Sequence, residues 1–279
     1  MKNTLALTLI ALLAGCASAP PDKPLPSTSP VEVGELRAGS GYLNGYLPRA
    51  TLPNSLQLLP PPPPAGTPEH AADDAAQRAS QTLRATARGE LATRDVILKF
   101  PAAADTFTCS MDLPISEAAT PHLNMLLRRT LADAGLATYA AKDHYKRARP
   151  FVQLKQSSCS PAEEKHLSTD GAYPSGHAAL GWAWALILIQ VAPERTDALL
   201  KRGYAFGQSR VVCNVHWQSD VDAGRTMGAA AVARLQSDAL FNAQLRAAKA
   251  EVDAARAKGV KGGNPAVDCA AEAAALSLK

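Results

Sequence analysis

Hydrophobic residues recur at helical spacing along most of the chain from about residue 70 onward. Residues 116–135 show this spacing from a polar start to Gly135, which predicts a helix that stops near the glycine. The leucines that set the spacing are Leu123, Leu126, Leu127 and Leu131. Residues 177–192 differ, because they are apolar on every side and stop at Pro193. About 20 residues are needed to cross a bilayer, so this shorter segment is predicted to be a buried core helix.

Other segments complete a helix-rich pattern. An Ala-rich stretch begins near Asp73 and runs to about Leu91, and further helices are predicted over residues 194–212, 216–235 and 238–257. The chain has 279 residues, of which 47% are hydrophobic and only 5% aromatic, and this suits one helical domain better than a β-sandwich. We therefore predict an all-α fold, built as a single-domain helical bundle.

The helical pattern weakens at both ends of the chain. Residues 16–38 are rich in Pro, Ser and Ala, which predicts a flexible tether. The chain from Lys258 is rich in Gly, Ala and Lys. The domain is therefore expected to cover residues 39–257, and the tail over residues 258–279 is predicted to be loose unless Cys269 holds it.

The first residues have the form of an export signal. A lysine precedes an apolar run over residues 5–13, which is too short to remain as a membrane span. The sequence Leu-Ala-Gly-Cys that ends at Cys16 resembles a bacterial lipobox, in which a signal peptide, here residues 1–15, is removed and the cysteine is lipidated. The alternative is ordinary cleavage after the small residues 17–19, which the proline that follows disfavours.

Four further cysteines follow, namely Cys109, Cys159, Cys213 and Cys269. In an exported, oxidising setting they predict two disulfides. Of the three pairings we favour Cys109–Cys159 together with Cys213–Cys269, and buried free thiols remain the alternative. No cysteines or histidines stand at zinc-binding intervals, so neither a metal site nor a cofactor is predicted.

The charged residues point to a small anion rather than to nucleic acid. The formal net charge is only +4 and is dispersed along the chain, which is too little for a nucleic-acid surface. A set of basic residues and histidines can surround a tetrahedral oxyanion with positive charge and N–H donors, while one histidine attacks it and the other protonates the leaving group. Three segments supply this set: Lys142-x6-Arg149-Pro150, Pro174-Ser175-Gly176-His177 and Ser209-Arg210-x5-His216-x3-Asp220.

The segment that ends at His177 directly precedes the apolar helix and is predicted to form its N-terminus. The first N–H groups of a helix are unpaired, and the helix dipole favours an anion there. Gly176 lets a phosphate approach the backbone closely, Ser175 can donate a further hydrogen bond, and His177 lies over the same spot. Taken alone, this turn could be an ordinary helix start.

His216 and Asp220 are four residues apart and are expected to share one face of a helix. A carboxylate bound to one imidazole nitrogen leaves the other free to attack. Arg210 lies six residues before His216, and on an unbroken helix it would point to a different face. We therefore predict that the helix breaks at Cys213-Asn214, since Asn tolerates a left-handed backbone.

Lys142 and Arg149 complete the predicted anion site. Arginine offers a planar fork for two phosphate oxygens, and lysine acts as a point charge. Pro150 is predicted to end the helix that carries them. Arg149 also belongs to a short basic run with Lys146 and Arg147, and such runs usually face solvent.

The order and spacing of the three segments resemble the signature of the PAP2 superfamily of acid phosphatases, which also includes vanadium haloperoxidases and membrane lipid phosphatases. Over about residues 40–257 the chain is similar to bacterial class A non-specific acid phosphatases. The resemblance implies a helical bundle of the PAP2 acid phosphatase type and metal-free hydrolysis. It implies that His216 becomes a phosphohistidine, that His177 protonates the leaving alcohol and then activates water, and that Asp220 orients His216. The phosphate-binding residues it implies are Lys142, Arg149, Ser175, Gly176 and Arg210.

The sequence therefore predicts an exported acid phosphatase with broad specificity for phosphomonoesters such as nucleotides, sugar phosphates and aryl phosphates. Contact with a membrane is expected only through a lipid on Cys16, at the periplasmic side, with a soluble periplasmic protein as the alternative. No nucleic-acid partner is expected, and a homo-oligomer is left open. Two other functions compete: a vanadium-dependent haloperoxidase with vanadate at His216, and a phosphate-binding lipoprotein without turnover.

Overall fold

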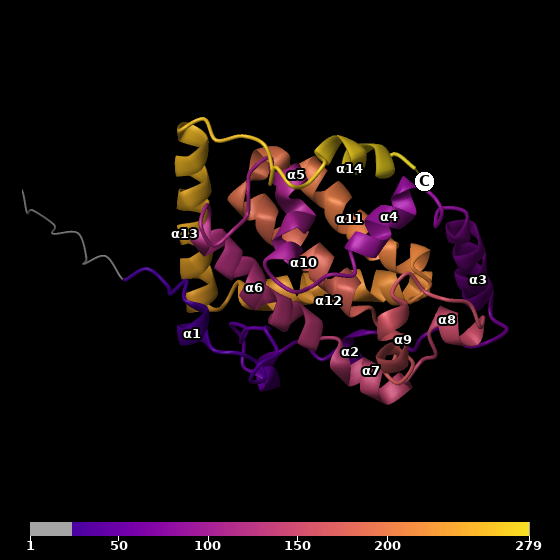
Figure 1. Cartoon of the computed structure of the whole chain (residues 1–279). Coiled ribbons are helices and arrows are strands. Elements are labelled where there is room, and N and C mark those ends of the chain that lie inside the picture. The colour runs from indigo at the N-terminus through magenta and orange to yellow at the C-terminus, as the bar shows by residue number, and fades with distance from the viewer. Residues whose placement is uncertain (1–23, 279) are drawn as a thin grey trace, which may run out of the picture.

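The computed structural model describes residues 24–278 as a bundle of helices (Figure 1). The signal peptide predicted over residues 1–15 and the lipidation site Cys16 lie outside the described residues. Within residues 24–278 the only extended pairing is an isolated bridge between Glu35 and Leu43, which confirms the predicted all-α class. Among the helices of this part, none is both long and apolar enough to cross a membrane.

The helices differ widely in length, and the longest ones lie in the C-terminal half. In chain order the α-helices of the described part are α1 (Pro30–Val33), α2 (Ser55–Leu58), α3 (Pro68–Gln81), α4 (Ala87–Arg94), α5 (Thr108–Met111), α6 (Pro121–Leu136), α7 (Tyr139–Tyr145), α8 (Pro150–Gln153), α9 (Glu164–Leu167), α10 (Gly176–Val191), α11 (Thr196–Val212), α12 (Gln218–Leu235), α13 (Ala239–Ala257) and α14 (Cys269–Ala275). The 3-10 helices are η1 (Arg49–Thr51), η2 (Ala102–Phe107), η3 (Pro161–Glu163) and η4 (Pro193–Arg195).

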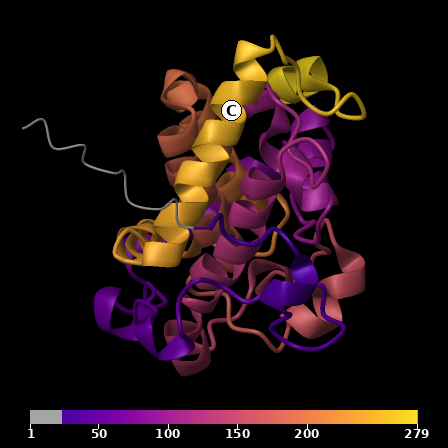
Figure 2. The ribbon, with the colours of Figure 1, turned by 90° about the vertical axis from the view of Figure 1, so that its left-hand side faces the viewer.

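Helix α10 is the apolar segment of the sequence, and it forms the centre of the bundle. It packs against α6, α11, α12 and α13 (Figure 1), and Figure 2 shows α13 running along one side of the bundle. Trp184, Ile187 and Leu188 of α10 have no exposed surface, and the indole N–H of Trp184 donates to the carbonyl oxygen of Leu127 on α6 at 3.1 Å. Burying each such side chain contributes roughly 1.5–3 kcal/mol. The prediction of a core helix is therefore confirmed.

Two glycines bring α12 against the first half of α10. A Cβ atom at Gly224 would lie 2.4 Å from the carbonyl oxygen of Ser175, and one at Gly228 would lie 2.3 Å from that of Ala179. Only residues without a side chain allow this approach. The start of α12 therefore lies beside the start of α10, and this juxtaposition brings two of the three sequence segments together.

The N-terminal third of the chain differs from the prediction in two places. The Ala-rich stretch from Asp73 to Leu91 is not continuous, because α3 ends at Gln81 and Thr86 caps a separate helix, α4, by accepting the backbone N–H of Arg88. The predicted tether also holds structure in its described part, residues 24–38, where α1 forms and Glu35 pairs with Leu43. Ordered structure therefore begins before residue 39.

The C-terminal tail is part of the folded domain, because Cys269 holds it, which is the condition under which the tail was not expected to be loose. Helix α14 packs against α4 (Figure 1), and a disulfide joins Cys269 to Cys109 with their Cα atoms 5.4 Å apart. Glu272 of α14 is buried and lies 3.4 Å from the guanidinium of Arg202 on α11. The disulfide and this ion pair hold α14 to the bundle.

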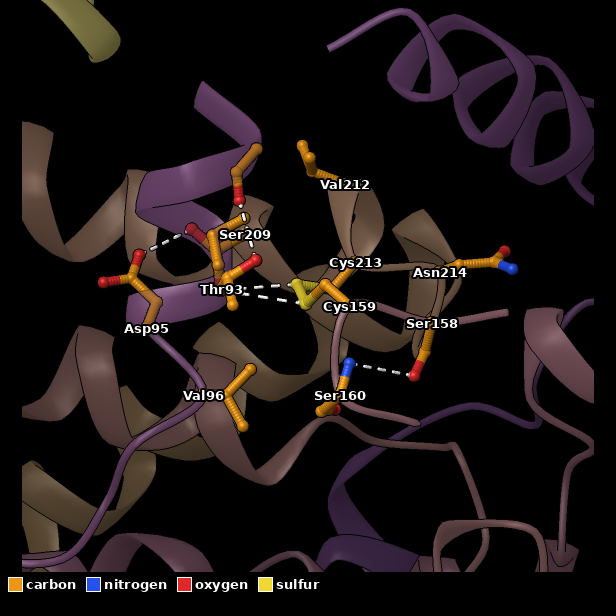
Figure 3. Close-up of a disulfide and its surroundings, with 12 residues drawn as sticks. Thr93, Asp95, Val96, Ser158, Cys159, Ser160, Ser209, Val212, Cys213 and Asn214 are labelled. Carbon is orange, nitrogen blue, oxygen red and sulfur yellow. Dashed lines mark hydrogen bonds between the residues drawn. A yellow bond between two sulfur atoms is a disulfide. The ribbon is translucent and has the colours of Figure 1, made fainter. Parts of the chain in front are cut away.

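The favoured pairing of the cysteines was also wrong. Besides Cys109–Cys269, the structure joins Cys159 to Cys213, with Cα atoms 4.8 Å apart (Figure 3). The loop after α8 runs beside the end of α11, where the backbone N–H of Cys159 donates to the carbonyl oxygen of Cys213 at 3.2 Å. Tertiary contacts, which cysteine order does not reveal, decide the pairing.

Candidate active site

The start of α10 is a capped helix N-terminus, placed where the sequence predicts it. Ser175 is the N-cap residue, and its side-chain oxygen accepts the backbone N–H of Ala178 at 3.3 Å. The cap leaves the N–H groups of Gly176 and His177 at the exposed end of the helix dipole. The backbone N–H of Ser175 donates to the carbonyl oxygen of Asp220 at 2.8 Å, so α10 and α12 begin at one place.

The helix break predicted between Arg210 and His216 is present. Helix α11 ends at Val212, Asn214 has a left-handed backbone with φ of 63°, and α12 begins at Gln218. The backbone N–H groups of Val215 and His216 both donate to the carbonyl oxygen of Arg210, at 3.1 and 3.3 Å. The break therefore folds the chain back so that His216 and Arg210 lie together.

His216 and Asp220 meet, although not on a helix face as predicted. His216 precedes α12, and Asp220 is the third residue of that helix. Nδ1 of His216 lies 3.4 Å from Oδ2 of Asp220, which also accepts the backbone N–H of Trp217 at 2.8 Å. The first turn of α12, rather than an i, i+4 helical spacing, brings the pair together.

Arg149 lies directly against the other side of the His216 imidazole. Its Nη1 atom is 3.0 Å from Nε2 of His216 and donates to the carbonyl oxygen of Val215 at 3.0 Å. Arg149 precedes α8, so Pro150 begins a helix rather than ending one, and the prediction for this proline was wrong. Proline suits the first position of a helix because no N–H donor is needed there. Lys142 lies on a different helix, α7.

Asp170 joins Lys142 to Arg149, and sequence reasoning missed it. Its Oδ2 atom accepts a hydrogen bond from Nη2 of Arg149 at 2.8 Å and lies 3.6 Å from Nζ of Lys142. The lysine also donates to the carbonyl oxygen of Gly171 at 2.6 Å. Asp170 is only four residues before Pro174, which begins the segment that ends at His177. This nearness in sequence is the signal that could have pointed to Asp170.

Arg210 supplies a third cation and is buried, with 1% of its surface exposed. Within residues 24–278, its Nε and Nη1 atoms have no hydrogen-bond partner. Burial, followed by the positive charge of Arg149, lowers the pKa of Arg210 to about 9. A buried guanidinium with free donors is costly unless an anion meets it, so this group fits an anionic ligand.

His177 is held by a backbone carbonyl that sequence reasoning did not identify. Its Nε2 atom lies 3.1 Å from the carbonyl oxygen of Val96, and its ring stacks on Phe206 with centroids 6.0 Å apart. A carbonyl oxygen only accepts, so Nε2 carries a hydrogen and Nδ1 is the nitrogen that gains or loses a proton. Figure 3 shows Val96 near the disulfide between Cys159 and Cys213.

The site is cationic and mostly buried. Burial, and then the charge of Arg149, lowers the pKa of His216 well below its ordinary range and lowers the pKa of Lys142 to about 8. Burial, and then the charge of Arg210, lowers the pKa of His177 in the same way. The cations and the two imidazoles therefore influence one another strongly, and a bound anion would relieve all of these shifts.

The structure brings together the residues that the sequence singled out, and they come from separate elements. The buried imidazole of His216 and the half-buried imidazole of His177 lie with three cations and a helix N-terminus. This arrangement is suited to stabilising a phosphoryl group while it is transferred. Among residues 24–278, no group of three or more His, Cys, Asp or Glu side chains is placed to hold a metal ion. The residues so gathered are Lys142, Arg149, Ser175, Gly176, His177, Arg210, His216 and Asp220.

The fold and the site define a helical protein with a largely buried cationic site that contains two histidines. Residues 123–240 match the PAP2 superfamily. The chain is 45% identical to a non-specific acid phosphatase of Providencia stuartii over 207 residues, which are 74% of this chain and 84% of that protein. It is 39% identical to a non-specific acid phosphatase of Salmonella typhimurium over 72% of this chain and 80% of the relative. An acid phosphatase of Zymomonas mobilis is 37% identical over 72% and 76%. The chain therefore belongs to the PAP2 superfamily, within its bacterial class A non-specific acid phosphatases.

Proposed function

We propose that the protein is a metal-independent acid phosphatase that hydrolyses small phosphomonoesters through a phosphohistidine on His216. The main support is the contact of both nitrogens of His216: Nδ1 faces the carboxylate of Asp220, and Nε2 faces the cation Arg149. This orientation suits attack by Nε2 on a phosphorus atom whose oxygens are held by cations. The names of the curated relatives agree with the reaction class.

In the first step of the proposed reaction, Nε2 of His216 attacks phosphorus, and a P–N bond forms as the ester P–O bond breaks. His177 gives its proton to the leaving oxygen, so the alcohol departs neutral. Arg149 donates toward Nε2 in this structure, and a phosphoryl oxygen would draw that N–H away and free the lone pair. Asp220 keeps the proton of the imidazole on Nδ1.

In the second step, His177 takes a proton from water, and the oxygen attacks phosphorus as the P–N bond breaks. This step releases inorganic phosphate and restores His216. The oxygens are held throughout by the side chains of Lys142, Arg149 and Arg210 and by the N-terminus of α10 at Ser175 and Gly176. Most of the rate enhancement then comes from charge stabilisation and positioning.

The test is hydrolysis of p-nitrophenyl phosphate in EDTA by the purified protein and by His216→Ala, with exposed His166→Ala as the matched control. We expect turnover that falls about 1,000-fold or more in His216→Ala and is unchanged in the control. Labelled substrate, quenched in alkali, should leave phosphate on the wild-type protein. Since p-nitrophenolate leaves without an acid, His177→Ala should give a burst and then stall.

Turnover that requires a metal, or activity that survives in His216→Ala, would refute the proposed mechanism. The same preparation, given vanadate, bromide and peroxide, tests the haloperoxidase alternative. Phosphate binding without turnover in any assay would leave the binding-protein alternative.

We also propose that the protein is exported and carries a lipid on Cys16. The two disulfides support an oxidising compartment. Palmitate labelling of the full chain should be lost in Cys16→Ala, and labelling that persists would contradict the anchor.

A further inference from the structure

Arg147 is a basic residue of the run that was expected to face solvent, yet its guanidinium lies between two buried carboxylates. Nη1 donates to Oδ1 of Asp220 at 2.6 Å, and Nη2 donates to Oδ2 of Asp73 at 2.7 Å. The side chain of Arg147 is 11% exposed, and those of Asp73 and Asp220 are 3% and 0% exposed. Only a planar fork can hold two carboxylates in this way.

The two oxygens of Asp220 are divided between Arg147 and the nucleophile. Oδ1 accepts from Arg147, whereas Oδ2 accepts the backbone N–H of Trp217 and lies 3.4 Å from Nδ1 of His216. If Oδ1 were released, the carboxylate could rotate away from the imidazole. Arg147 therefore sets which oxygen of Asp220 faces His216.

Asp73 in turn fixes Arg147 from an element that is distant in sequence. It lies on α3, outside the region that matches the superfamily, and its Oδ1 atom accepts the backbone N–H of Ser219 at 2.8 Å. Its Oδ2 atom accepts hydrogen bonds from the guanidinium of Arg147 and from the hydroxyl of Ser219, the latter at 2.6 Å. One turn later on α3, Gln77 donates to the side-chain oxygen of Asn214 at 2.8 Å. Helix α3 therefore braces the break that carries His216.

We propose that Arg147 is a positioning residue that acts through Asp220 to orient His216, and that Asp73 holds Arg147 in place. The inference rests on the proposed role of His216 as nucleophile. Neither Arg147 nor Asp73 contacts the phosphate in this proposal.

The charges around the pair give the proposal a measurable sign. Burial raises the pKa of Asp220, and the charge of Arg147 is the main influence that opposes it. Removing this cation raises the pKa of either member of the His216–Asp220 pair, whereas removing the negative charge of Asp73 lowers it. The titratable and charged groups that face Asp220 are Arg147, Asp73, His216, Lys142, Arg149 and Tyr173.

The test compares Arg147→Gln, Arg147→Lys and Asp73→Asn by kcat, KM and the pH profile of kcat/KM on one substrate. Exposed Lys146→Gln removes one charge from the neighbouring residue and is the control. We expect Arg147→Gln to lower kcat about 10- to 100-fold through misplacement of His216 and to move the acid limb to higher pH. Arg147→Lys keeps the charge, so its acid limb should stay while kcat falls.

Asp73→Asn tests the same inference if Arg147→Gln does not fold, and its acid limb is expected to move in the opposite direction. Its kcat should fall several-fold, and its acid limb should move to lower pH. The Ki of inorganic phosphate should stay the same in Arg147→Lys and change by less than kcat in the other two variants, because the phosphate-binding residues are untouched and only the lost charge acts on the anion.

A wild-type pH profile and kcat in Arg147→Gln, while His216→Ala is inactive, would overturn this inference alone. A loss of kcat accompanied by an equal weakening of phosphate inhibition would also overturn it, since that result indicates a collapsed pocket. A wild-type protein without turnover would instead refute the proposed function.

Discussion

Replacing Arg210 by methionine is expected to stabilise the folded protein while abolishing its activity. Arg210 is buried at 1% exposure, and its Nε and Nη1 atoms have no partner within residues 24–278. A buried, unpaired charge is unfavourable in the absence of ligand. We infer that an arginine stands here because its guanidinium binds the phosphoryl group of the substrate.

The magnitude follows from the proton affinity of Arg210. Burial, and then the charge of Arg149, lowers its pKa from the ordinary value to about 9. The affinity of Arg210 for its proton is therefore lower by roughly three to four powers of ten. At about 1.4 kcal/mol for each power of ten, this amounts to about 5 kcal/mol. Because a depressed pKa of a base destabilises the fold below that pKa, the cost applies in full at neutral pH. Allowing for relaxation, we expect Arg210→Met to raise the free energy of unfolding by about 2 to 4 kcal/mol and Tm by about 5 to 15 °C.

Arg202 on the same helix provides the matched control. It is also buried, but it donates to Asp95 at 3.1 Å and lies 3.4 Å from Glu272. Burial is the largest influence and lowers the pKa of Arg202, but the charges and hydrogen bonds of Asp95 and Glu272 together outweigh it, so the net direction is upward. Arg202→Met leaves two buried carboxylates without their cation, so it should cost about 3 to 5 kcal/mol.

Thermal and urea unfolding of the three proteins, with and without inorganic phosphate, measures both effects. Phosphate should stabilise the wild type, by about 2.7 kcal/mol at a hundredfold excess over Kd, and should have little effect on Arg210→Met. If Arg210→Met is less stable than the wild type without phosphate, or if it keeps full activity, the reasoning from the unpaired guanidinium fails.

Three other outcomes are expected. Asp170→Asn removes a negative charge that offsets the positive charges of Arg149 and Lys142, so the Ki of inorganic phosphate should fall about tenfold. An unchanged or higher Ki would show that the carboxylate instead helps to hold the anion site. Burial and the charge of Arg210 lower the pKa of His177 in the free protein, and a bound phosphate dianion raises it again. The basic limb of the pH profile of kcat should therefore lie at higher pH than the basic limb of kcat/KM. Coincident basic limbs would contradict the role of His177 as the acid. Joint replacement of Cys109 and Cys269 by serine opens a link across 160 residues and should lower unfolding stability by about 2 to 5 kcal/mol, leaving kcat unchanged.

Two predictions that rested on local chemistry agree with the structure. Ser175 caps α10 because a side-chain oxygen placed before an apolar helical run meets its unpaired N–H groups. The break at Asn214 follows from the positions of Arg210 and His216, which one straight helix cannot bring together. In both cases the residues involved are a few positions apart, so their spacing carries the geometry.

The wrong predictions have two causes. One residue type can occupy more than one kind of position, and contacts between distant parts of the chain leave no local signal in the sequence. Pro150 was predicted to end a helix, yet proline suits the first position of a helix equally well. Arg147 resembles any solvent-facing basic residue until α3 places Asp73 beside it. The pairing of the cysteines depends on the same kind of contact, because neither sequence spacing nor composition shows which loops adjoin.

The two disulfides are nested, since Cys159–Cys213 lies wholly inside the loop that Cys109–Cys269 closes. A chain that enters an oxidising compartment N-terminus first presents Cys109 and then Cys159, which are not partners. An oxidant that joins cysteines in order of arrival therefore makes the wrong bond first. If the protein is exported as proposed, its maturation is expected to depend on thiol–disulfide exchange or on a delay of oxidation until Cys269 has arrived.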